Sequence, residues 1–481
     1  MMGEKIWSLD DLLKATGGEL ISGSRQRVNF CGISTDSRTI ERGNVFVALI
    51  GERFDGHDFL MEALEKGAEC LIVEKLPDSF DIMASGTRHD APIHIPTIIK
   101  VPSTLKALGD LAHYHRSSFT GPVVGITGSN GKTSTKEMIA SVLEGSFQVL
   151  KNPMNWNNNI GVPLSLLRLE DHHTAIVIEM GINHLNEMDE LVATAEPTIG
   201  VITNIQKAHL EGLESEEQIF REKTKLWRAL PKEKGCAIVN LDDPWLFRAS
   251  EDLKNVAILY FSLKGNADLT VDGDVQCSRK GTSFIARSGK DMAEVNLPVL
   301  GEHFALNALA ALAVGIHLGI SLETGAKRLS NWKPVSHRME CLVLHDGSVI
   351  IDDTYNANPG SMIRAIETVA KMAYSENKPF IAVIGDMKEL GHASEELHRL
   401  VGQSLAEKKP AGIFTLGSLA SFIAEEGRKA GVPVVIEAMN HSTLLEALTE
   451  HWIPGAWLLV KGSRSMRMEQ IVEGLVADAE T

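Results

Sequence analysis

The sequence predicts an α/β protein with three domains. From residue 106 to about 330, continuous apolar segments of strand length alternate with helical segments, which favours a parallel sheet covered on both faces. The same alternation resumes after residue 340. A chain of 481 residues is also too long for one hydrophobic core. We therefore expect domains at residues 1–105, 106–332 and 333–481.

Composition restricts the partners. The formal net charge is −16, so the surface repels nucleic acid and anionic membranes, and an anionic ligand needs local basic groups or backbone N–H groups. The five cysteines are scattered and form no C-x-x-C pair, which fits a reducing cytoplasm and no cysteine zinc site. The N-terminal segment has no apolar core, and no apolar run reaches membrane-spanning length. We expect a cytoplasmic protein with no membrane insertion.

In the first domain, Ser8 is expected to cap a helix that ends at Gly17. Short strand and turn signals follow in "VNFCGISTDSR", "NVFVALIGERFDGHDF" and "AECLIVE". Residues 77–97 are rich in turn formers and predict a surface loop near the end of this domain.

The expected strands and helices of the other two domains follow from apolar runs. The predicted strands of the second domain are Val123–Thr127, Ala175–Met180, Ile199–Ile205 and Ala237–Leu241. Residues Ala305–Ile320 predict a buried helix. "NWKPVSHRME" predicts a domain junction, because a Lys-Pro pair interrupts regular structure. "VIIDDTYNANPG", "FIAVIGDM", "GIFTLG" and "WLLVKGS" then predict the last sheet, which contains no dinucleotide fingerprint.

One segment has the layout of a phosphate-binding loop. The strand Val123–Thr127 leads into "GSNGKTS" and then into a helical pattern. Gly128 and Gly131 let the backbone approach an anion, Lys132 supplies a charge, and Thr133 can hold Mg²⁺.

The loop departs from the strict pattern at one position. The strict pattern has a glycine where this chain has Ile126, and Gly125 lies one residue early. A glycine-rich turn before a helix is the alternative interpretation. The strand-turn-helix context and the Gly-Lys-Thr triplet argue against it.

Charged residues follow further predicted strands. Glu179 ends the strand in "AIVIEMGINH", where it could bind Mg²⁺ or polarise water; an acid in solvent is an equal alternative. His209 and Glu211 in "ITNIQKAHLEG" follow the next strand, and the His209 side chain could reach the same edge, although a single histidine is more often structural. For Lys223 in "REKTKLW", the residues alone favour a lysine in solvent.

Asparagines gather in "KNPMNWNNNIGVP". Clustered carboxamides can hold a peptide substrate by paired hydrogen bonds, and an Asn-rich loop without a ligand is the alternative. The cluster consists of Asn152, Asn155, Asn157, Asn158 and Asn159. Asn307 is the odd polar member of "HFALNALAAL", and a buried carboxamide needs partners such as a purine edge.

Together these motifs resemble one enzyme family. "GITGSNGKTS", "EMG", "ITNIQKAHLE" and "HFALNALAA" are similar to motifs of the Mur ligases of peptidoglycan synthesis and their folylpolyglutamate synthase relatives. "STDSR" with "FVALIGERFDGHDF" resembles the first domain shared by the third and fourth amino-acid-adding members. "DDTYNANPGSM", "GDMKELGHASEELHRLVG" and "KGSRSMRME" resemble the last of them. The resemblance covers essentially the whole chain.

The resemblance implies three functional domains. These would be an N-terminal UDP-substrate domain, a central P-loop-type ATPase domain with a parallel sheet, and a C-terminal Rossmann-like domain that closes over the site. It implies a ligase that uses ATP and two Mg²⁺ sites to join D-alanyl-D-alanine to UDP-N-acetylmuramoyl-tripeptide, giving the pentapeptide precursor of peptidoglycan. ATP would phosphorylate the terminal carboxylate, and the dipeptide amine would attack the acyl phosphate. We expect a monomer.

The resemblance also assigns catalytic and metal-binding residues. The catalytic residues would be Lys132, Glu179, His209, Lys223 and Arg338. Arg338 would reach the γ-phosphate on domain closure. The magnesium ligands would be Thr133, Glu179, His209 and a carbamylated Lys223, a modification that needs a neutral amine and therefore a lowered pKa. Around this lysine the family often has the pattern Ala-Lys-x-Glu, whereas this chain has Glu222-Lys223-Thr224-Lys225. The lysine matches the pattern, and its neighbours do not.

The remaining assignments concern the three substrates. ATP would contact Gly128, Ser129, Asn130, Gly131, Lys132, Thr133, Ser134, Asn307, Arg338, Asp353 and Tyr355. The UDP-substrate would contact Ser34, Asp36, Ser37, Arg38, Asp55, Gly56 and His57, the last three at the start of a helix that suits a diphosphate. The acceptor and peptide would contact Asn157, Asn158, Asn159, Asn356 and Asn358.

Three other functions stay open at this point. A sister ligase could add a different amino acid, although "YNANPGSM" counts against it. An ATP-driven switch or binding module would explain the phosphate loop, but neither the first domain nor the asparagine cluster. A kinase that releases a stable phosphorylated product would need no second acceptor. No motif specifies whether the third residue of the tripeptide is diaminopimelate or lysine.

Overall fold

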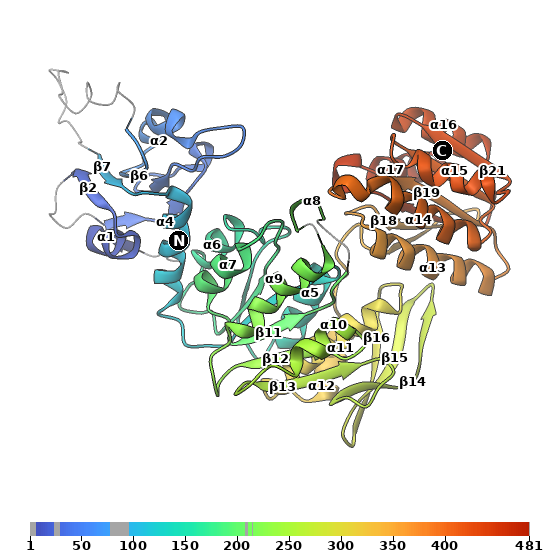
Figure 1. Cartoon of the computed structure of the whole chain (residues 1–481), viewed down its shortest axis with the longest axis horizontal. Helices are drawn as coiled ribbons and strands as arrows, with labels where there is room; N and C mark the ends of the chain where they lie inside the picture. The colour runs from blue at the N-terminus through green and yellow to red at the C-terminus, as the bar shows by residue number, and fades with distance from the viewer. Residues whose placement is uncertain (1–5, 24–28, 77–95, 207–209, 214, 481) are drawn as a thin grey trace. The chain divides into compact units, whose positions relative to one another are not determined.

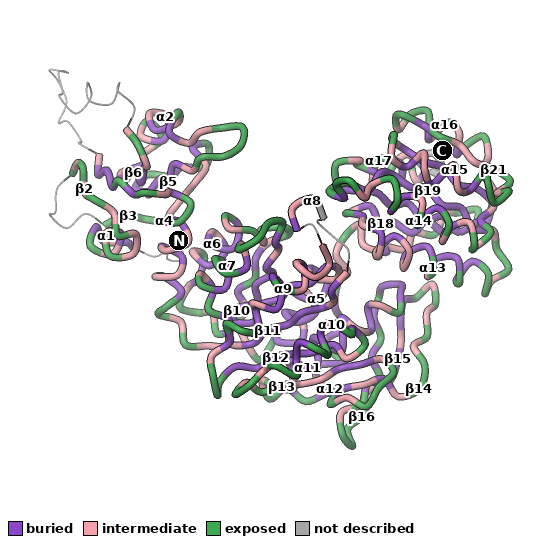
Figure 2. The backbone as a smooth tube through the Cα atoms, viewed as in Figure 1, coloured by how far each residue is buried: buried purple, intermediate pink, exposed green. Residues whose placement is uncertain are grey.

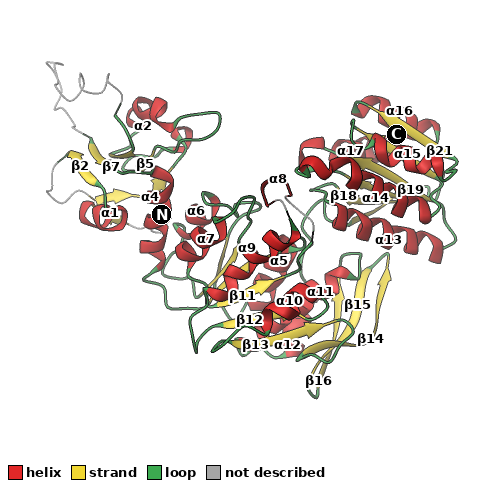
Figure 3. Ribbon diagram, in the orientation of Figure 1, coloured by secondary structure: helices red, strands yellow, loops and turns green. Residues whose placement is uncertain are grey.

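The computed structural model describes residues 6–23, 29–76, 96–206, 210–213 and 215–480. Strands and helices are interspersed along these residues (Figures 1 and 3), as the predicted α/β class requires. The chain divides into two compact units: residues 1–125, 147–182 and 187–198 form the first, and the rest of the chain forms the second. No helix in the described part of the chain is both long and apolar enough to span a membrane.

The sequence predicts both ends of the first helix in the first unit. In α1 (Leu9–Thr16), the Ser8 side chain accepts a hydrogen bond from the Asp11 amide, and Gly17 ends the helix at φ +62°. A five-stranded sheet follows in the order β2-β7-β6-β5-β4, and its inner strands pair in parallel. The strands are β2 (Glu19–Ser22), β4 (Ile33–Ser34), β5 (Val45–Val47), β6 (Cys70–Val73) and β7 (Thr97–Lys100). A separate pair joins β1 (Ile6–Ser8) to β3 (Asn29–Cys31).

The remaining elements of the first unit carry the asparagine-rich loop. Strand β9 (Val149–Lys151) pairs in parallel with β10 (Ala175–Glu179), and the loop after β9 leads into α6 (Gly161–Leu166). The other helices are α2 (Leu60–Glu65), α4 (Thr104–Arg116) and α7 (Glu187–Ala195).

The largest sheet has nine strands in the order β16-β15-β14-β13-β12-β11-β8-β10-β9. Strands β11 to β14 pair in parallel, and β14 to β16 form an antiparallel meander. Figure 2 shows β11 and β12 as buried, in agreement with their continuous apolar sequences. The strands are β8 (Val123–Thr127), β11 (Ile199–Ile202), β12 (Cys236–Asn240), β13 (Ala257–Ser262), β14 (Leu269–Ser278), β15 (Gly281–Ser288) and β16 (Asp291–Leu297).

Six helices of the second unit accompany this sheet. Two of them pack tightly together, namely α5 (Lys132–Leu143) and α11 (His303–His317). The others are α8 (Leu210–Leu213), α9 (Glu216–Arg228), α10 (Pro244–Ser250) and α12 (Leu322–Ser330).

The C-terminal part of the second unit contains a six-stranded sheet in the order β17-β18-β22-β19-β20-β21. All pairs are parallel except β17 with β18. Apolar residues of α16 and α17 bury one face of this sheet, and α13 packs against β19 and β22. The strands are β17 (Glu340–Val343), β18 (Val349–Asp353), β19 (Phe380–Gly385), β20 (Gly412–Leu416), β21 (Val434–Ala438) and β22 (Trp457–Lys461). The helices are α13 (Pro359–Ser375), α14 (Ser394–Glu407), α15 (Ser421–Lys429), α16 (His441–Glu450) and α17 (Glu469–Glu480).

The predicted strands occur with small changes of boundary. Val123–Thr127 is β8 as predicted, whereas the strand predicted to reach Ile205 ends at Ile202, because the next residues bond to the phosphate loop instead. The helix predicted to open at Asp55 begins with a 3₁₀ turn over Gly56–Phe59, which Asp55 caps by accepting from the His57 amide and which runs directly into α2. Most of the loop predicted at residues 77–97 lies outside the described residues. The three domain boundaries stay predictions.

Candidate functional site

The predicted phosphate loop connects β8 to α5 and requires its glycines. Gly131 has φ +80° and caps α5, and Gly128 has φ +143°. A Cβ atom on Gly128 would lie 1.9 Å from the Thr203 hydroxyl, so no side chain fits there. The N-terminus of α5 has no side-chain cap. Its first N–H groups are therefore suited to an anion.

Residues that follow β11 hold the loop in place. The Ser129 and Asn130 amides donate to Asn204, at 2.9 Å to its carbonyl and 3.0 Å to its side-chain oxygen. The Ser129 hydroxyl donates to the Gln206 carbonyl at 2.8 Å. Lys132 Nζ donates to the Gly128 carbonyl at 2.8 Å, so the charge lies over the loop. The loop is thus a preorganised cradle.

A cavity of about 140 Å³ lies beside this cradle. Its wall includes Asn307 and Leu306 from α11, Phe261 from β13, and Arg364 from α13. Asn307 is only 6% exposed, and its Oδ1 would lie 2.7 Å from a Cβ on Gly131. The carboxamide therefore lies against the phosphate loop, and Asn307 also lines the cavity.

His303 also lines the cavity. Burial and the nearby charges of Arg364 and Lys461 lower the pKa of His303 to about 3. The imidazole is therefore neutral at pH 7 and can accept as well as donate a hydrogen bond.

Arg338 reaches the phosphate loop from the predicted domain junction. Its Nη2 donates to the Thr133 hydroxyl at 3.2 Å, and its guanidinium lies 4.2 Å from the centre of the Tyr355 ring. Both neighbours, His337 at φ +62° and Met339 at φ +51°, occupy the left-handed region that non-glycine residues rarely adopt. Such backbone strain persists only where the surroundings enforce it.

Two carboxylates enforce this strained turn. His337 Nδ1 pairs with Asp352 Oδ2 at 2.8 Å, and the Met339 amide donates to Asp353 Oδ1 at 3.2 Å. The Thr354 amide and hydroxyl donate to the other Asp352 oxygen. The turn therefore fixes the direction in which Arg338 leaves the backbone.

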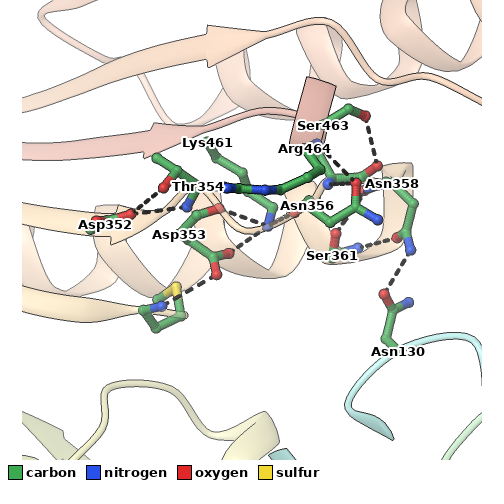
Figure 4. Close-up of polar contacts among 12 residues, drawn as sticks. Asn130, Asp352, Asp353, Thr354, Asn356, Asn358, Ser361, Lys461, Ser463 and Arg464 are labelled. Atoms are coloured by element: carbon green, nitrogen blue, oxygen red, sulfur yellow. Dashed lines mark hydrogen bonds and ion pairs between the residues drawn. The ribbon is translucent and has the colours of Figure 1, made fainter. Parts of the chain in front are cut away.

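Asp353 is also one end of a buried polar network (Figure 4). Lys461, which is 2% exposed, donates to Asp353 Oδ2 at 2.5 Å and to the Asn356 carbonyl at 2.9 Å. Burial lowers the pKa of Lys461, although the charge of Asp353 opposes that shift. Asn358 caps α13, and its Nδ2 donates to Asn130 Oδ1 at 2.7 Å. The network thus joins the C-terminal sheet to the phosphate loop.

Lys223 on α9 is buried, where the residues alone favoured solvent. Its side chain is 1% exposed, and Nζ has no hydrogen-bond partner among the described residues. Burial, together with the charge of Lys132, holds the pKa of Lys223 well below its usual range. The neighbouring carboxylate of Glu222 forms an ion pair with Lys225 and not with Lys223. An amine with a lowered pKa is the reactive form that carbamylation needs.

In the first unit, Glu179 is 2% exposed at the end of β10. Its Oε1 accepts from Asn157 Nδ2 at 2.8 Å, whereas Oε2 is buried with no partner among the described residues. A buried carboxylate oxygen without a partner is costly unless a cation binds it. The donor chemistry of Glu179 therefore fits a metal ion.

The other asparagines of the first unit support its backbone. Asn152 bonds to the Glu179 backbone through both side-chain atoms, at 2.9 and 3.0 Å. Asn158 Oδ1 accepts from the amide of Gly161 at the start of α6, and Asn159 bonds to Glu190. These contacts hold the loop that presents Asn157 to Glu179.

The residues expected to bind the UDP-substrate form two turns of the first unit. Asp36 caps the turn Ser37–Thr39 and pairs with Arg38, whose hydrogen bonds lower the pKa of Asp36 to about 2. Ser34 bonds to the Asp36 backbone. Arg38 is exposed, so this turn offers a cation to solvent.

The second turn is more closed. The two ring nitrogens of His57 are engaged, by Asp55 at 2.6 Å and by the Glu74 amide at 3.0 Å. A Cβ on Gly56 would lie 2.7 Å from the Leu49 carbonyl, so glycine is required there. The amides of this turn are engaged as well, because Gly56 N donates to the Leu49 carbonyl at 2.7 Å and His57 N donates to Asp55 Oδ1 at 3.0 Å.

The structure brings most of the predicted nucleotide residues together within the second unit. His209 lies outside the described residues. Sequence reasoning missed Thr203, Asn204 and Gln206, although polar residues directly after a strand were a usable signal. It also missed Arg364, which lies within the α13 helix, where no local pattern marks it.

Comparisons with known proteins identify relatives over most of the chain. Models described as "Mur ligase family, catalytic domain", "Mur ligase middle domain" and "Mur ligase, glutamate ligase domain" match residues 29–116, 126–315 and 337–464. These three matches agree with the predicted three-domain α/β fold. A Bacillus subtilis protein named UDP-N-acetylmuramoyl-tripeptide--D-alanyl-D-alanine ligase is 33% identical over 473 residues, which cover 98% of each chain. An Escherichia coli protein of the same name is 34% identical and covers 97% of this chain and 98% of its own.

The chain also resembles solved structures of MurF ligases over most of its length. The chain is similar to a crystal structure of MurF from Acinetobacter baumannii, with a TM-score of 0.87, 31% identity, and coverage of 99% of this chain and 100% of that one. A MurF ligase from Thermotoga maritima in complex with ADP has a TM-score of 0.80 and 29% identity, and the match covers 93% of this chain and 97% of that one.

Proposed function

Because the chain belongs to the Mur ligase family, we propose that it joins D-alanyl-D-alanine to UDP-N-acetylmuramoyl-tripeptide at the cost of ATP. The observation that carries the proposal is the contact between Arg338 and Thr133. It brings a cation from the C-terminal part onto the phosphate loop, which is what transfer of a γ-phosphate to a carboxylate requires.

ATP would bind along the phosphate loop and the adjoining cavity. Its phosphates would accept from the N-terminal amides of α5 and from Lys132. The adenine would lie in the cavity, where the Asn307 carboxamide can bond to a purine edge. Tyr355 and Asp353 would act mainly through Arg338, one by stacking on it and the other by holding its turn.

The residues present also fit magnesium. Mg²⁺, when bound, would neutralise charge between the γ-phosphate and the substrate carboxylate. In the first unit, Glu179 Oε2 is the candidate ligand, because it is buried and has no partner in the part of the chain that the structure describes. In the second unit, the Thr133 hydroxyl and a carbamylated Lys223 are the candidates. Without the carbamate, Lys223 would leave a buried amine with no partner among the residues that the structure covers.

The UDP-substrate, the peptide and the acceptor would be bound by residues outside the nucleotide cavity. The exposed Arg38 and the turn at Asp55, Gly56 and His57 are proposed for the UDP-substrate. Asn157 and the exposed Asn356 are proposed for the peptide and the acceptor. The cytoplasmic location and the monomeric state also remain proposals, as does the role of His209.

The test follows phosphate release and product mass together. Purified protein is given ATP, Mg²⁺ and UDP-N-acetylmuramoyl-tripeptide, with and without D-alanyl-D-alanine. We expect phosphate release to need both substrates and the mass to show the dipeptide joined. Phosphate release with neither substrate would favour the ATP-driven switch, and a stable phosphorylated product without the dipeptide would favour the kinase.

A screen of amine acceptors separates the proposed ligase from a sister ligase. D-alanyl-D-alanine should be preferred over single amino acids at equal concentration. Running the screen with the diaminopimelate and the lysine tripeptide also identifies the third residue that the enzyme accepts. A single amino acid that outperforms the dipeptide would contradict the proposed acceptor.

A further inference from the structure

Besides the contact between Arg338 and Thr133, a second contact joins the C-terminal part of the second unit to the nine-stranded sheet. It involves no residue that lines the nucleotide cavity. Arg279 lies at the tip of the hairpin formed by β14 and β15, and Glu376 directly follows α13. Arg279 Nε donates to the two Glu376 oxygens at 2.8 and 3.1 Å, and Nη2 donates to Oε2 as well. We refer to Arg279, Glu376 and Trp457 as the clasp.

Trp457 anchors the clasp to the C-terminal sheet. Its Nε1 donates to Glu376 Oε2 at 3.0 Å, and the Arg279 guanidinium lies 5.5 Å from the centre of its ring. Trp457 is fully buried in β22, between β18 and β19. The hydrogen bond with Glu376 raises the pKa of Arg279, and Arg279 lowers that of Glu376. The pair is therefore ionised across the neutral range and is held on a rigid support.

The hairpin side of the clasp is coupled to the helix that carries Asn307. Gly281, just after Arg279, has no space for a Cβ, which would lie 1.9 Å from the Leu297 carbonyl. The residue after Gly281 is Thr282, whose Oγ1 donates to the Val299 carbonyl at 2.8 Å and accepts from the Gly301 amide at 3.0 Å. These bonds tie the hairpin to the segment that starts α11.

The helix side of the clasp leads to another residue that lines the same cavity, Arg364. Helix α13 has 17 residues, so its two ends lie about 25 Å apart. At its N-terminal end, Asn358 bonds to Asn130, and Arg364 Nη1 donates to Gln206 Oε1 at 2.8 Å. A Cβ on Gly360 would lie 2.5 Å from the same Gln206 oxygen. The N-terminal end of α13 therefore packs closely on the phosphate loop.

We infer that Arg279 and Glu376 are positioning residues for the nucleotide site. The clasp joins the hairpin coupled to α11 with the C-terminal end of α13, and these two helices supply Asn307 and Arg364 to one cavity. It thereby fixes the position of α11 relative to α13, although none of the three clasp residues is among those that line the cavity. The inference rests on the proposed use of ATP, and it names residues that set the geometry of that site from a distance.

The test compares clasp variants with a matched variant on the same hairpin. Arg279→Ala and Glu376→Ala remove the clasp, and the double variant R279E with E376R reverses its charges. Arg287→Ala is the control, because Arg287 pairs with Asp272 within the hairpin and has a similar exposure. Two measurements are made: the affinity for ADP by calorimetry, without tripeptide or dipeptide, and hydrogen exchange of the peptides that cover residues 128–134 and 358–364.

Each single clasp variant should weaken ADP binding about two- to tenfold, the range expected for a partly exposed ion pair with a stacked guanidinium. Exchange should rise at residues 358–364, at the far end of α13. The charge-reversed pair should recover only part of the affinity, because its arginine cannot accept the hydrogen bond from Trp457 Nε1. Arg287→Ala should stay within about twofold of the wild type. The inference is overturned if the clasp variants match Arg287→Ala in both measurements.

The two readouts separate the inference from the proposed function. If ADP binds and the clasp variants weaken its binding, the inference stands whichever amine the enzyme accepts. If ADP does not bind the wild type at all, the proposed function fails, and the exchange data alone decide whether the clasp positions α13. Arg279→Lys is a milder variant in case Ala impairs folding. It keeps the charge but loses the planar fork, so it should fall between wild type and Ala.

Discussion

Replacing Lys223 with methionine should make the protein more stable and inactive at the same time. The Lys223 side chain is 1% exposed, and Nζ has no partner among the described residues. A buried polar group left unpaired costs about 1–3 kcal/mol, which a methionine of similar length does not incur. At about 2–4 °C per kcal/mol for a domain of this size, the unfolding midpoint should rise by about 2–12 °C.

The pH dependence has a definite sign. Because burial lowers the pKa of Lys223 in the folded state, the unfolded chain binds more protons at that site between the folded pKa and 10.5. Wild-type stability should therefore rise with pH in that window. Lys223→Met has no amine to titrate. The difference in unfolding midpoint between the variant and the wild type should therefore shrink as the pH approaches 10.5.

The assay is thermal unfolding from pH 7 to 10 in buffer free of CO₂ and metal, so that no carbamate compensates the amine. Lys225→Met is the matched control two positions away on α9, since Lys225 pairs with Glu222 and its loss should lower the midpoint. If Lys223→Met lowers the midpoint as the control does, the amine is not an unpaired buried group and the reasoning fails. In ¹³C-bicarbonate, the wild type alone should show a carbamate carbon signal.

Two further predictions concern the phosphate loop. Lys132→Ala should abolish turnover while the thermal midpoint stays near that of the wild type, because Lys132 supplies the charge over the loop; near-normal turnover would refute the phosphate-loop assignment. Tyr355→Leu should lower kcat about 2- to 30-fold, since a cation–π contact with Arg338 contributes about 0.5–2 kcal/mol. Tyr355→Phe keeps the ring and should stay close to wild type, so an equal loss in both variants would show that stacking is not the cause.

The sequence alone determined the α/β class and the family, and it predicted the phosphate loop. These features are local: the strand, the glycines and the Lys-Thr pair of the loop lie within a dozen residues, and their spacing is their signal. The glycines at 128 and 131 illustrate this, because their positive φ values are demanded by the turn into α5 itself. Most residues proposed to bind the nucleotide could be named in advance for the same reason.

Only the tertiary structure decided the state of individual side chains. Lys223 belongs to a helical face that reads as charged and solvated, yet packing buries its amine and lowers its pKa. Arg364 and the Arg279–Glu376 pair carry no local pattern, because each partner lies about 100 or more residues away along the chain. Burial and pairing depend on what the fold places opposite a residue. Sequence spacing therefore identified the chemistry of the site, and the tertiary contacts determined how its residues are positioned.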